Sequence, residues 1–206
     1  MEYLYSMNKI KSFIKDNKYN LILILIYCVV VFITMSYHEL SNDECYPWTI
    51  VRQDTLSDVI NTIRFDGHAF LWYFLILPFA KPDFPVISIQ ITAALVMISA
   101  VCFFLLKSPF NIFFKSIFIF SAGMLYFYPV MARNYSLIPL FVFLLAYLYP
   151  KRHNMPIVYS LLIIMLFQTH PYIGGFCLIL SLMFIFECIE NIVFKKSLYD
   201  CVSPVV

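Results

Sequence analysis

Apolar residues fill most of the chain in long blocks that short polar stretches separate. Residues 19–37, 85–106, 112–131, 135–149, 155–169 and 172–194 form almost continuous apolar runs. A helix needs about 20 such residues to cross the hydrocarbon core of a bilayer. The pattern therefore predicts an all-α membrane protein with about six transmembrane helices.

A shorter apolar block covers residues 70–79 and is expected to lie at the membrane surface without crossing it. As a helix it would rise about 15 Å, against a hydrocarbon core of about 30 Å, and Pro78 interrupts it. If this block does not span, the later basic clusters fall on the same side as the N-terminus, as the positive-inside rule prefers. Those clusters are Lys107 with Lys115, Lys151-Arg152, and Lys195-Lys196.

The first apolar block follows a lysine-rich segment, which is also typical of a secretory signal peptide. No small-x-small cleavage site follows the block, and it approaches the length of a full span. We therefore expect a retained first helix with the N-terminus in the cytoplasm. The lysines are Lys9, Lys11, Lys15 and Lys18.

Residues 38–83 would then form an outer loop with helices of its own. The spacing of its apolar residues predicts an amphipathic helix over residues 55–64 that lies flat on the membrane. Thr55 and Asp58 form a capping signal at its start. Trp48 and Trp72 flank this helix, as expected for an interfacial belt. The apolar stripe is Leu56, Val59, Ile60 and Ile63.

Composition agrees with this picture, since 62% of the 206 residues are hydrophobic and only 13% are charged, with a mean hydropathy of +0.84. These values exclude an ordinary soluble domain. The net charge of +2 gives no indication of a nucleic-acid partner. Six cysteines without a CxxC pair are expected to be buried apolar residues, not metal ligands. We expect one membrane domain over residues 1–206, with five further spans within 85–194 and a tail at 195–206.

The candidate chemistry lies in polar groups that this topology places on the outer face. Ionisable side chains beside a bilayer are costly and are often functional. Asp43-Glu44 opens the outer loop, and the other candidates follow along the chain. They are Asp66 and His68, Lys81, Arg133 with Tyr135, and His170.

Each candidate also has a purely structural interpretation. Ser41-x-x-Glu44 is a capping box, which alone would explain Glu44, so Asp43 is the stronger candidate for chemistry. The remaining alternatives are a turn at Asp66-Gly67, a helix cap for His68, an interfacial side chain for Arg133 and a helix-ending turn at His170-Pro171.

The order of these motifs resembles the integral membrane glycosyltransferases of the GT-C superfamily, which include protein mannosyltransferases of family 39 and lipid A sugar transferases. The similarity covers residues 42–150. Two features differ from that family, because Ala69 and Phe70 stand where its members usually have two prolines, and its members are at least twice as long. A truncated member is therefore one alternative. The motifs are Asp43-Glu44, Pro47-Trp48, Asp66-Gly67-His68, Leu71-Trp72-Tyr73 and Ala132-Arg133-Asn134-Tyr135.

The resemblance implies transfer of a sugar from a polyprenyl-phosphate donor to a glycan, lipid or protein acceptor, at the outer face of a bacterial cell membrane. Asp43 would be the catalytic base, with Glu44 assisting it or orienting the acceptor. Arg133 would bind the donor phosphate, with Lys81 as a weaker second cation. Asp66, His68, Tyr135 and His170 would contact substrate. No cofactor is required, although the site allows a divalent metal.

Two other functions remain open at this point. In a transporter or flippase, the acidic pair and Arg133 would bind substrate or protons along an alternating-access path. A non-catalytic, truncated membrane subunit is the other alternative, and the short chain favours it.

Overall fold

The computed structural model describes residues 9, 11–66, 70–82 and 84–202, with the backbone alone for residues 65, 66 and 194–202. Within these ranges the chain is helical and contains no strand. The elements are α2 (Lys18–Ser36), α3 (Asn42–Gln53), α4 (Leu56–Asp66), α5 (Phe70–Ala80), α6 (Ile87–Lys107), α7 (Ile112–Ile119), η1 (Gly123–Phe127), η2 (Asn134–Ser136), α8 (Leu137–Leu148), η3 (Tyr149–Lys151), α9 (Pro156–Phe167), η4 (Pro171–Ile173) and α10 (Gly174–Val202).

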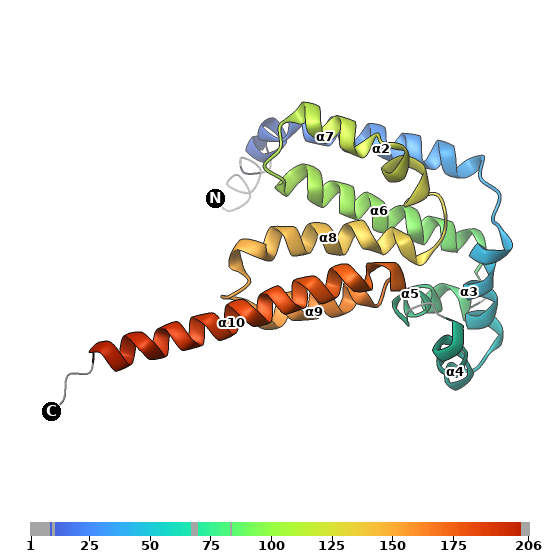
Figure 1. Cartoon of the computed structure of the whole chain (residues 1–206). Coiled ribbons are helices and arrows are strands. Elements are labelled where there is room, and N and C mark those ends of the chain that lie inside the picture. The colour runs from blue at the N-terminus through green and yellow to red at the C-terminus, as the bar shows by residue number, and fades with distance from the viewer. Residues whose placement is uncertain (1–8, 10, 67–69, 83, 203–206) are drawn as a thin grey trace, which may run out of the picture.

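Most of the helices run side by side in a bundle, in the order α2, α6, α8, α9 and α10 (Figure 1). Helix α6 packs against α2 on one side and α8 on the other, and the series continues from α8 to α9 and α10. More than half of the apolar stretch of α6 is buried, against 17% in α2 and 11% in the segment Pro171–Val193, which includes the first part of α10. The two outer helices therefore expose long apolar surfaces, as helices in contact with lipid do.

Three helical segments are long and apolar enough to cross a membrane: Lys18–Ser36, Ile87–Lys107 and Pro171–Val193. They match three of the predicted spans within a few residues. Helices α8 and α9 also match predicted apolar blocks, but each has only 12 residues of α-helix. The six predicted spans are therefore present only in part as long helices.

The predicted span over residues 112–131 is broken in the structure. Helix α7 ends at Ile119, and a short π-helix, η1, follows at Gly123–Phe127. The hydroxyl of Tyr27 donates a 2.5 Å hydrogen bond to the carbonyl of Met124 within η1. Gly123 and Pro129 are poor helix formers, and Tyr27 from α2 supplies a partner for backbone that leaves the regular α-helical pattern.

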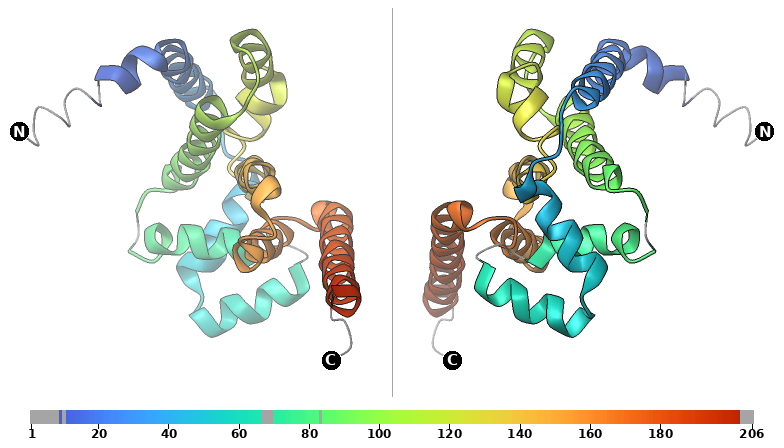
Figure 2. Two further views of the ribbon diagram at one scale, coloured as in Figure 1. Left: turned by 90° about the vertical axis from the view of Figure 1, so that its left-hand side faces the viewer. Right: turned by 90° about the vertical axis from the view of Figure 1, so that its right-hand side faces the viewer.

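Helices α3, α4 and α5 are short and lie across one end of the bundle (Figure 2). Helix α5 corresponds to the predicted surface helix over residues 70–79, and it continues through Pro78 to Ala80. It packs mainly against α3. The predicted amphipathic helix corresponds to α4, where the Thr55 hydroxyl contacts Asp58 Oδ2 at 2.5 Å and accepts the Asp58 N–H at 3.3 Å.

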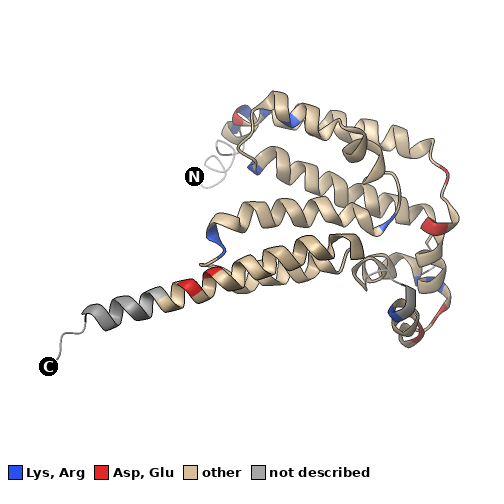
Figure 3. Cartoon of the chain, viewed as in Figure 1, with Lys and Arg blue, Asp and Glu red and all other residues tan. Residues whose placement is uncertain are grey.

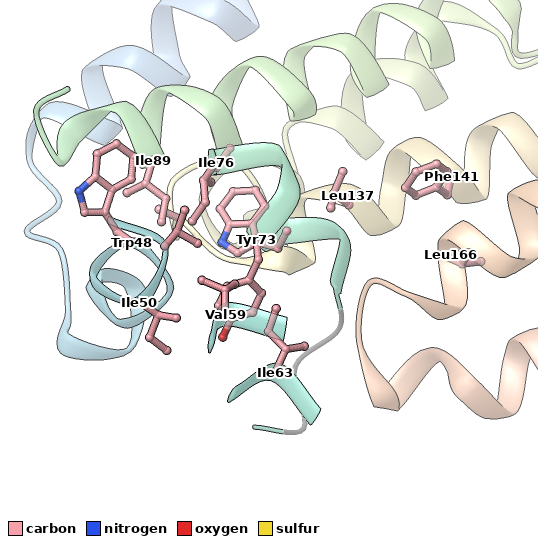
Figure 4. Packing of buried hydrophobic residues seen from close by; sticks show 14 of the residues in the cluster. Trp48, Ile50, Val59, Ile63, Tyr73, Ile76, Ile89, Leu137, Phe141 and Leu166 are labelled. Atoms are coloured by element: carbon pink, nitrogen blue, oxygen red, sulfur yellow. The ribbon is translucent and has the colours of Figure 1, made fainter. Parts of the chain in front are cut away.

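The apolar stripe predicted for α4 divides in the structure, because two of its residues face the protein core while Leu56 is 49% exposed. Val59 and Ile63 of α4 are 2% and 6% exposed, in one cluster with residues of α8 and α9 (Figure 4). Trp48 and Trp72, predicted in an interfacial belt, are 3% and 2% exposed in the same cluster. Packing of α3 against α5 buries both indoles, which the sequence spacing alone does not indicate.

Described charged residues gather toward the two ends of the bundle (Figure 3). Lys107 ends α6 and Lys151 ends η3, which follows α8, at the end of the bundle where α2 begins (Figure 1). Lys115 Nζ donates to the carbonyl of Leu105 near the end of α6. Asp43 and Glu44 belong to α3, at the opposite end of the bundle (Figure 1), and Arg133 contacts Asp43 there.

Candidate active site

Glu44 is fully buried and joins three parts of the chain. The backbone N–H and hydroxyl of Ser41 donate to its Oε2 at 2.9 and 2.8 Å, which completes the predicted capping box. The backbone N–H of Ala132 donates to Oε1 at 2.7 Å. His38 Nε2 lies 3.0 and 3.1 Å from the two carboxylate oxygens. Glu44 is therefore much more than a helix cap, because it ties α3 to the segment that precedes α8.

These contacts favour the ionised form of Glu44. Burial on its own raises the pKa of a carboxyl group. The hydrogen bonds from Ser41, Ala132 and His38 outweigh burial and hold the pKa of Glu44 below its usual value. A carboxylate with a lowered pKa and occupied lone pairs binds a proton weakly.

Asp43 points away from that buried network and pairs with Arg133. The two side chains meet at 3.3 Å, from Arg133 Nη1 to Asp43 Oδ2. Asp43 is 74% exposed and Arg133 is 20% exposed. Consecutive residues of α3 thus bind consecutive residues of the later segment, since Glu44 holds Ala132 and Asp43 holds Arg133. We define these two paired contacts as the double clamp.

A cavity of about 280 Å³ opens beside the double clamp. Its volume is close to the lower limit of about 300 Å³ for small-molecule pockets, which suits a single polar headgroup. Aromatic rings and the ion pair share its wall, so it offers apolar faces, one carboxylate and one guanidinium. The lining residues are Asp43, Tyr46, Pro47, Trp72, Tyr73, Arg133 and Asn134.

Tyr135 lies next to Arg133, and His170 packs against Tyr135. The guanidinium carbon of Arg133 is 5.4 Å from the centre of the Tyr135 ring, and the Tyr135 and His170 rings are 4.9 Å apart. Asn134 Nδ2 donates to the carbonyl of Thr169 at 2.5 Å, which joins the two segments. His170 is 8% exposed and accepts the N–H of Tyr172 at its Nδ1. Tyr135 and His170 are absent from the cavity lining, and Tyr135 contacts the lining residue Arg133 through its ring.

Of the other predicted site residues, only Lys81 has a described side chain. Lys81 donates from Nζ to the backbone carbonyl of Asp54, at the end of α3, and is absent from the lining. Asp66 ends α4, but only its backbone is described. His68 lies outside the described residues.

Sequence reasoning missed His38 and Tyr126. Because an ionised carboxylate only accepts hydrogen bonds, the contact with Glu44 assigns a hydrogen to His38 Nε2. On the other side of the ring, His38 Nδ1 lies 3.2 Å from the hydroxyl of Tyr126. His38 directly follows the first apolar block and precedes Glu44 by six residues. An imidazole at the end of a predicted span could have marked His38 as a candidate site residue. Nothing in the sequence around Tyr126 indicates its contact with His38.

Comparison of the chain with protein-family models, with curated proteins and with solved structures finds no match. The function must therefore be inferred from the residues and geometry of this site.

Proposed function

We propose that the protein is a membrane glycosyltransferase of the GT-C type, which transfers a sugar from a polyprenyl-phosphate donor to an acceptor hydroxyl. The observation that carries this proposal is the exposed carboxylate of Asp43 facing Arg133 in a headgroup-sized cavity. The cavity lies at the end of a bundle with three helices long enough to span. A lipid-linked substrate requires this combination of a polar site and an adjacent apolar surface.

In the proposed reaction, the acceptor oxygen attacks the anomeric carbon of the sugar. Its proton passes to the Asp43 carboxylate as the new carbon–oxygen bond forms. The bond from the anomeric carbon to the phosphate oxygen breaks, and polyprenyl phosphate leaves with the electron pair as an anion. This single displacement inverts the configuration at the anomeric carbon. Arg133 stabilises the charge on the leaving phosphate.

Glu44 is a positioning residue in this proposal. Its hydrogen bonds hold α3 against Ala132, which places Asp43 and Arg133 3.3 Å apart. Donor phosphate competes with Asp43 for Arg133, so binding of the donor frees the Asp43 carboxylate to accept a proton. No cofactor is needed. A divalent ion between Asp43 and the phosphate is the alternative, and loss of turnover in EDTA would reveal it.

The finer topology is also part of the proposal. We infer six membrane crossings, with the lysine-bearing end of the bundle in the cytoplasm and the candidate site on the outer side, as basic clusters favour. A cysteine introduced at Thr55 should react with a membrane-impermeant maleimide added outside intact cells. Labelling only after the cells are opened would show that the candidate site faces the cytoplasm, opposite to the proposed orientation.

Arg133→Ala is expected to weaken donor binding. A charge-assisted hydrogen bond is worth about 1.5–3 kcal/mol, so the KM for the donor should rise roughly 10-fold to 150-fold. Arg133→Lys should recover only part of this loss, because lysine cannot bind phosphate in a bidentate manner. The measurement is steady-state turnover of polyprenyl-phosphate sugars by purified protein.

Arg64→Ala is the matched control, because Arg64 is an exposed arginine of α4 outside the cavity lining. It should leave the donor KM unchanged. Equal KM values for Arg133→Ala and the wild type would remove Arg133 from the phosphate site. A wild type that transfers no sugar from any polyprenyl-phosphate donor would refute the proposed activity itself.

A further inference from the structure

A second and larger concavity lies at the other end of the bundle, between α6, α7 and α8. It has a volume of about 560 Å³, within the range of roughly 300–1,000 Å³ for ligand pockets. We call it the aromatic groove. Its lining residues are Phe103, Phe104, Lys107, Ser108, Pro109, Phe110, Phe114, Phe118, Phe143, Ala146 and Tyr147.

The walls of the aromatic groove pack on one another, so its shape is already formed. The Phe104 ring lies 4.9 Å from Phe118 and 5.0 Å from Phe143, measured between ring centres. Phe103 meets Tyr147 edge to face at 5.4 Å. These are favourable ring geometries, which join α6 to both α7 and α8.

Much of this apolar wall is nevertheless open. Phe110 and Phe114 are 57% and 61% exposed, and Tyr147 is 42% exposed. The groove includes the last residues of α6, a helix long enough to cross a membrane. Hydrocarbon is therefore the natural occupant of these walls.

Two lysines mark the polar end of the aromatic groove. Lys107 belongs to its lining. Lys151 Nζ lies 5.8 Å from the centre of the Tyr147 ring, which is itself part of the wall. The lining contains no Asp or Glu among the residues that the structure describes. A basic rim on an apolar groove is complementary to a lipid with an anionic headgroup.

We propose that the aromatic groove binds one anionic glycerophospholipid, with an acyl chain along the aromatic wall and the phosphate between Lys107 and Lys151. This lipid site is separate from the transferase site. Gln90, near the start of α6, donates to the carbonyl of His38 beside Glu44. Phe103 lies 13 residues later, about 20 Å further along the helix. The proposal does not depend on the proposed transferase activity.

The test measures lipid binding to the full chain by native mass spectrometry in detergent, during titration with phosphatidylglycerol or phosphatidylcholine of the same acyl chains. The wild type should retain one phosphatidylglycerol more strongly than phosphatidylcholine. Each lysine near an anionic headgroup contributes roughly fivefold in affinity, so Lys107→Gln with Lys151→Gln should weaken phosphatidylglycerol binding roughly 30-fold. Phosphatidylcholine binding should change little.

Lys15→Gln with Lys18→Gln is the matched control, since both lysines are exposed at the same end of the bundle and outside the groove lining. This pair should retain the wild-type preference. Ala146→Phe adds a ring inside the groove and should reduce the binding of both lipids, while circular dichroism confirms the helical fold.

Equal affinity of the wild type for the two lipids would overturn the anionic assignment. Equal loss in both lysine pairs would indicate general surface charge and overturn the site. Unchanged binding in Ala146→Phe would place the lipid elsewhere, and a lipid-free dimer that Ala146→Phe dissociates would make a second copy of the chain the occupant.

Discussion

Asp43→Asn should reduce sugar transfer by roughly 10²-fold to 10⁴-fold, the usual contribution of a general base. Asparagine keeps the size of the side chain but cannot take the acceptor proton. The loss should appear in kcat. The KM for the donor should stay the same or fall, because loss of the negative charge weakens the contact between residue 43 and Arg133, with which the donor phosphate competes. A purely structural role for Asp43 would not lower kcat while leaving the donor KM unchanged or reduced.

The fold should tolerate this substitution. Asp43 is 74% exposed, and surface ion pairs typically contribute about 0–1 kcal/mol to stability. Asp58→Asn is the matched control, since Asp58 is an exposed carboxylate that caps α4 and does not line the cavity. It should retain turnover within about twofold of the wild type. Full activity of Asp43→Asn would assign the base to another residue.

Glu44→Ala is expected to have the largest effect on stability, a loss of about 3–5 kcal/mol, as for other buried charges whose partners are left behind. The substitution leaves the N–H groups of Ser41 and Ala132 without their acceptor. It also empties space in a fully buried position. Activity should fall as well, because Asp43 loses its fixed position. Thermal unfolding in detergent measures the stability.

Glu44→Gln separates the effect of the lost charge on stability from the effect of the lost side-chain volume. The amide fills the same space but offers one acceptor oxygen in place of two, so we expect an intermediate loss of stability. Stability comparable to the wild type in Glu44→Ala would show that the carboxylate is not a structural centre.

The pH dependence gives a second readout of Glu44. Its pKa is lower in the folded state than the usual value of 4.5, so the folded protein binds the proton less readily than the unfolded chain. The stabilisation is therefore complete above about pH 5 and is lost as the pH falls below 4.5 through the folded-state pKa. Glu44→Gln should show a shallower loss of stability over the same acidic range.

Local signals in the sequence predicted several elements well. The caps Ser41 with Glu44 and Thr55 with Asp58 act over three residues, and both are present. The first and second long apolar blocks match α2 and α6 within two residues at each end. Continuous apolar stretches of that length specify a helix with little help from tertiary contacts.

Long-range contacts could not be predicted from the sequence. The partner of Glu44 is the backbone N–H of Ala132, 88 positions later, and every residue except proline carries such a group. Trp48 and Trp72 have the amphipathic character of interfacial residues, so only the packing of α3 on α5 decides that they are buried. The break after Ile119 was easier to predict from the sequence, since Gly123 and Pro129 both disfavour a continuous helix.

The double clamp also has a consequence for biosynthesis. When α3 leaves the ribosome, Glu44 has Ser41 and His38 nearby, but Ala132 has not yet been made. At roughly 5–20 residues per second, translation takes about 4–18 seconds to cover the intervening 88 residues. During that interval α3 lacks its final anchor, so we expect the first loop to reach its mature arrangement only when the segment before α8 emerges.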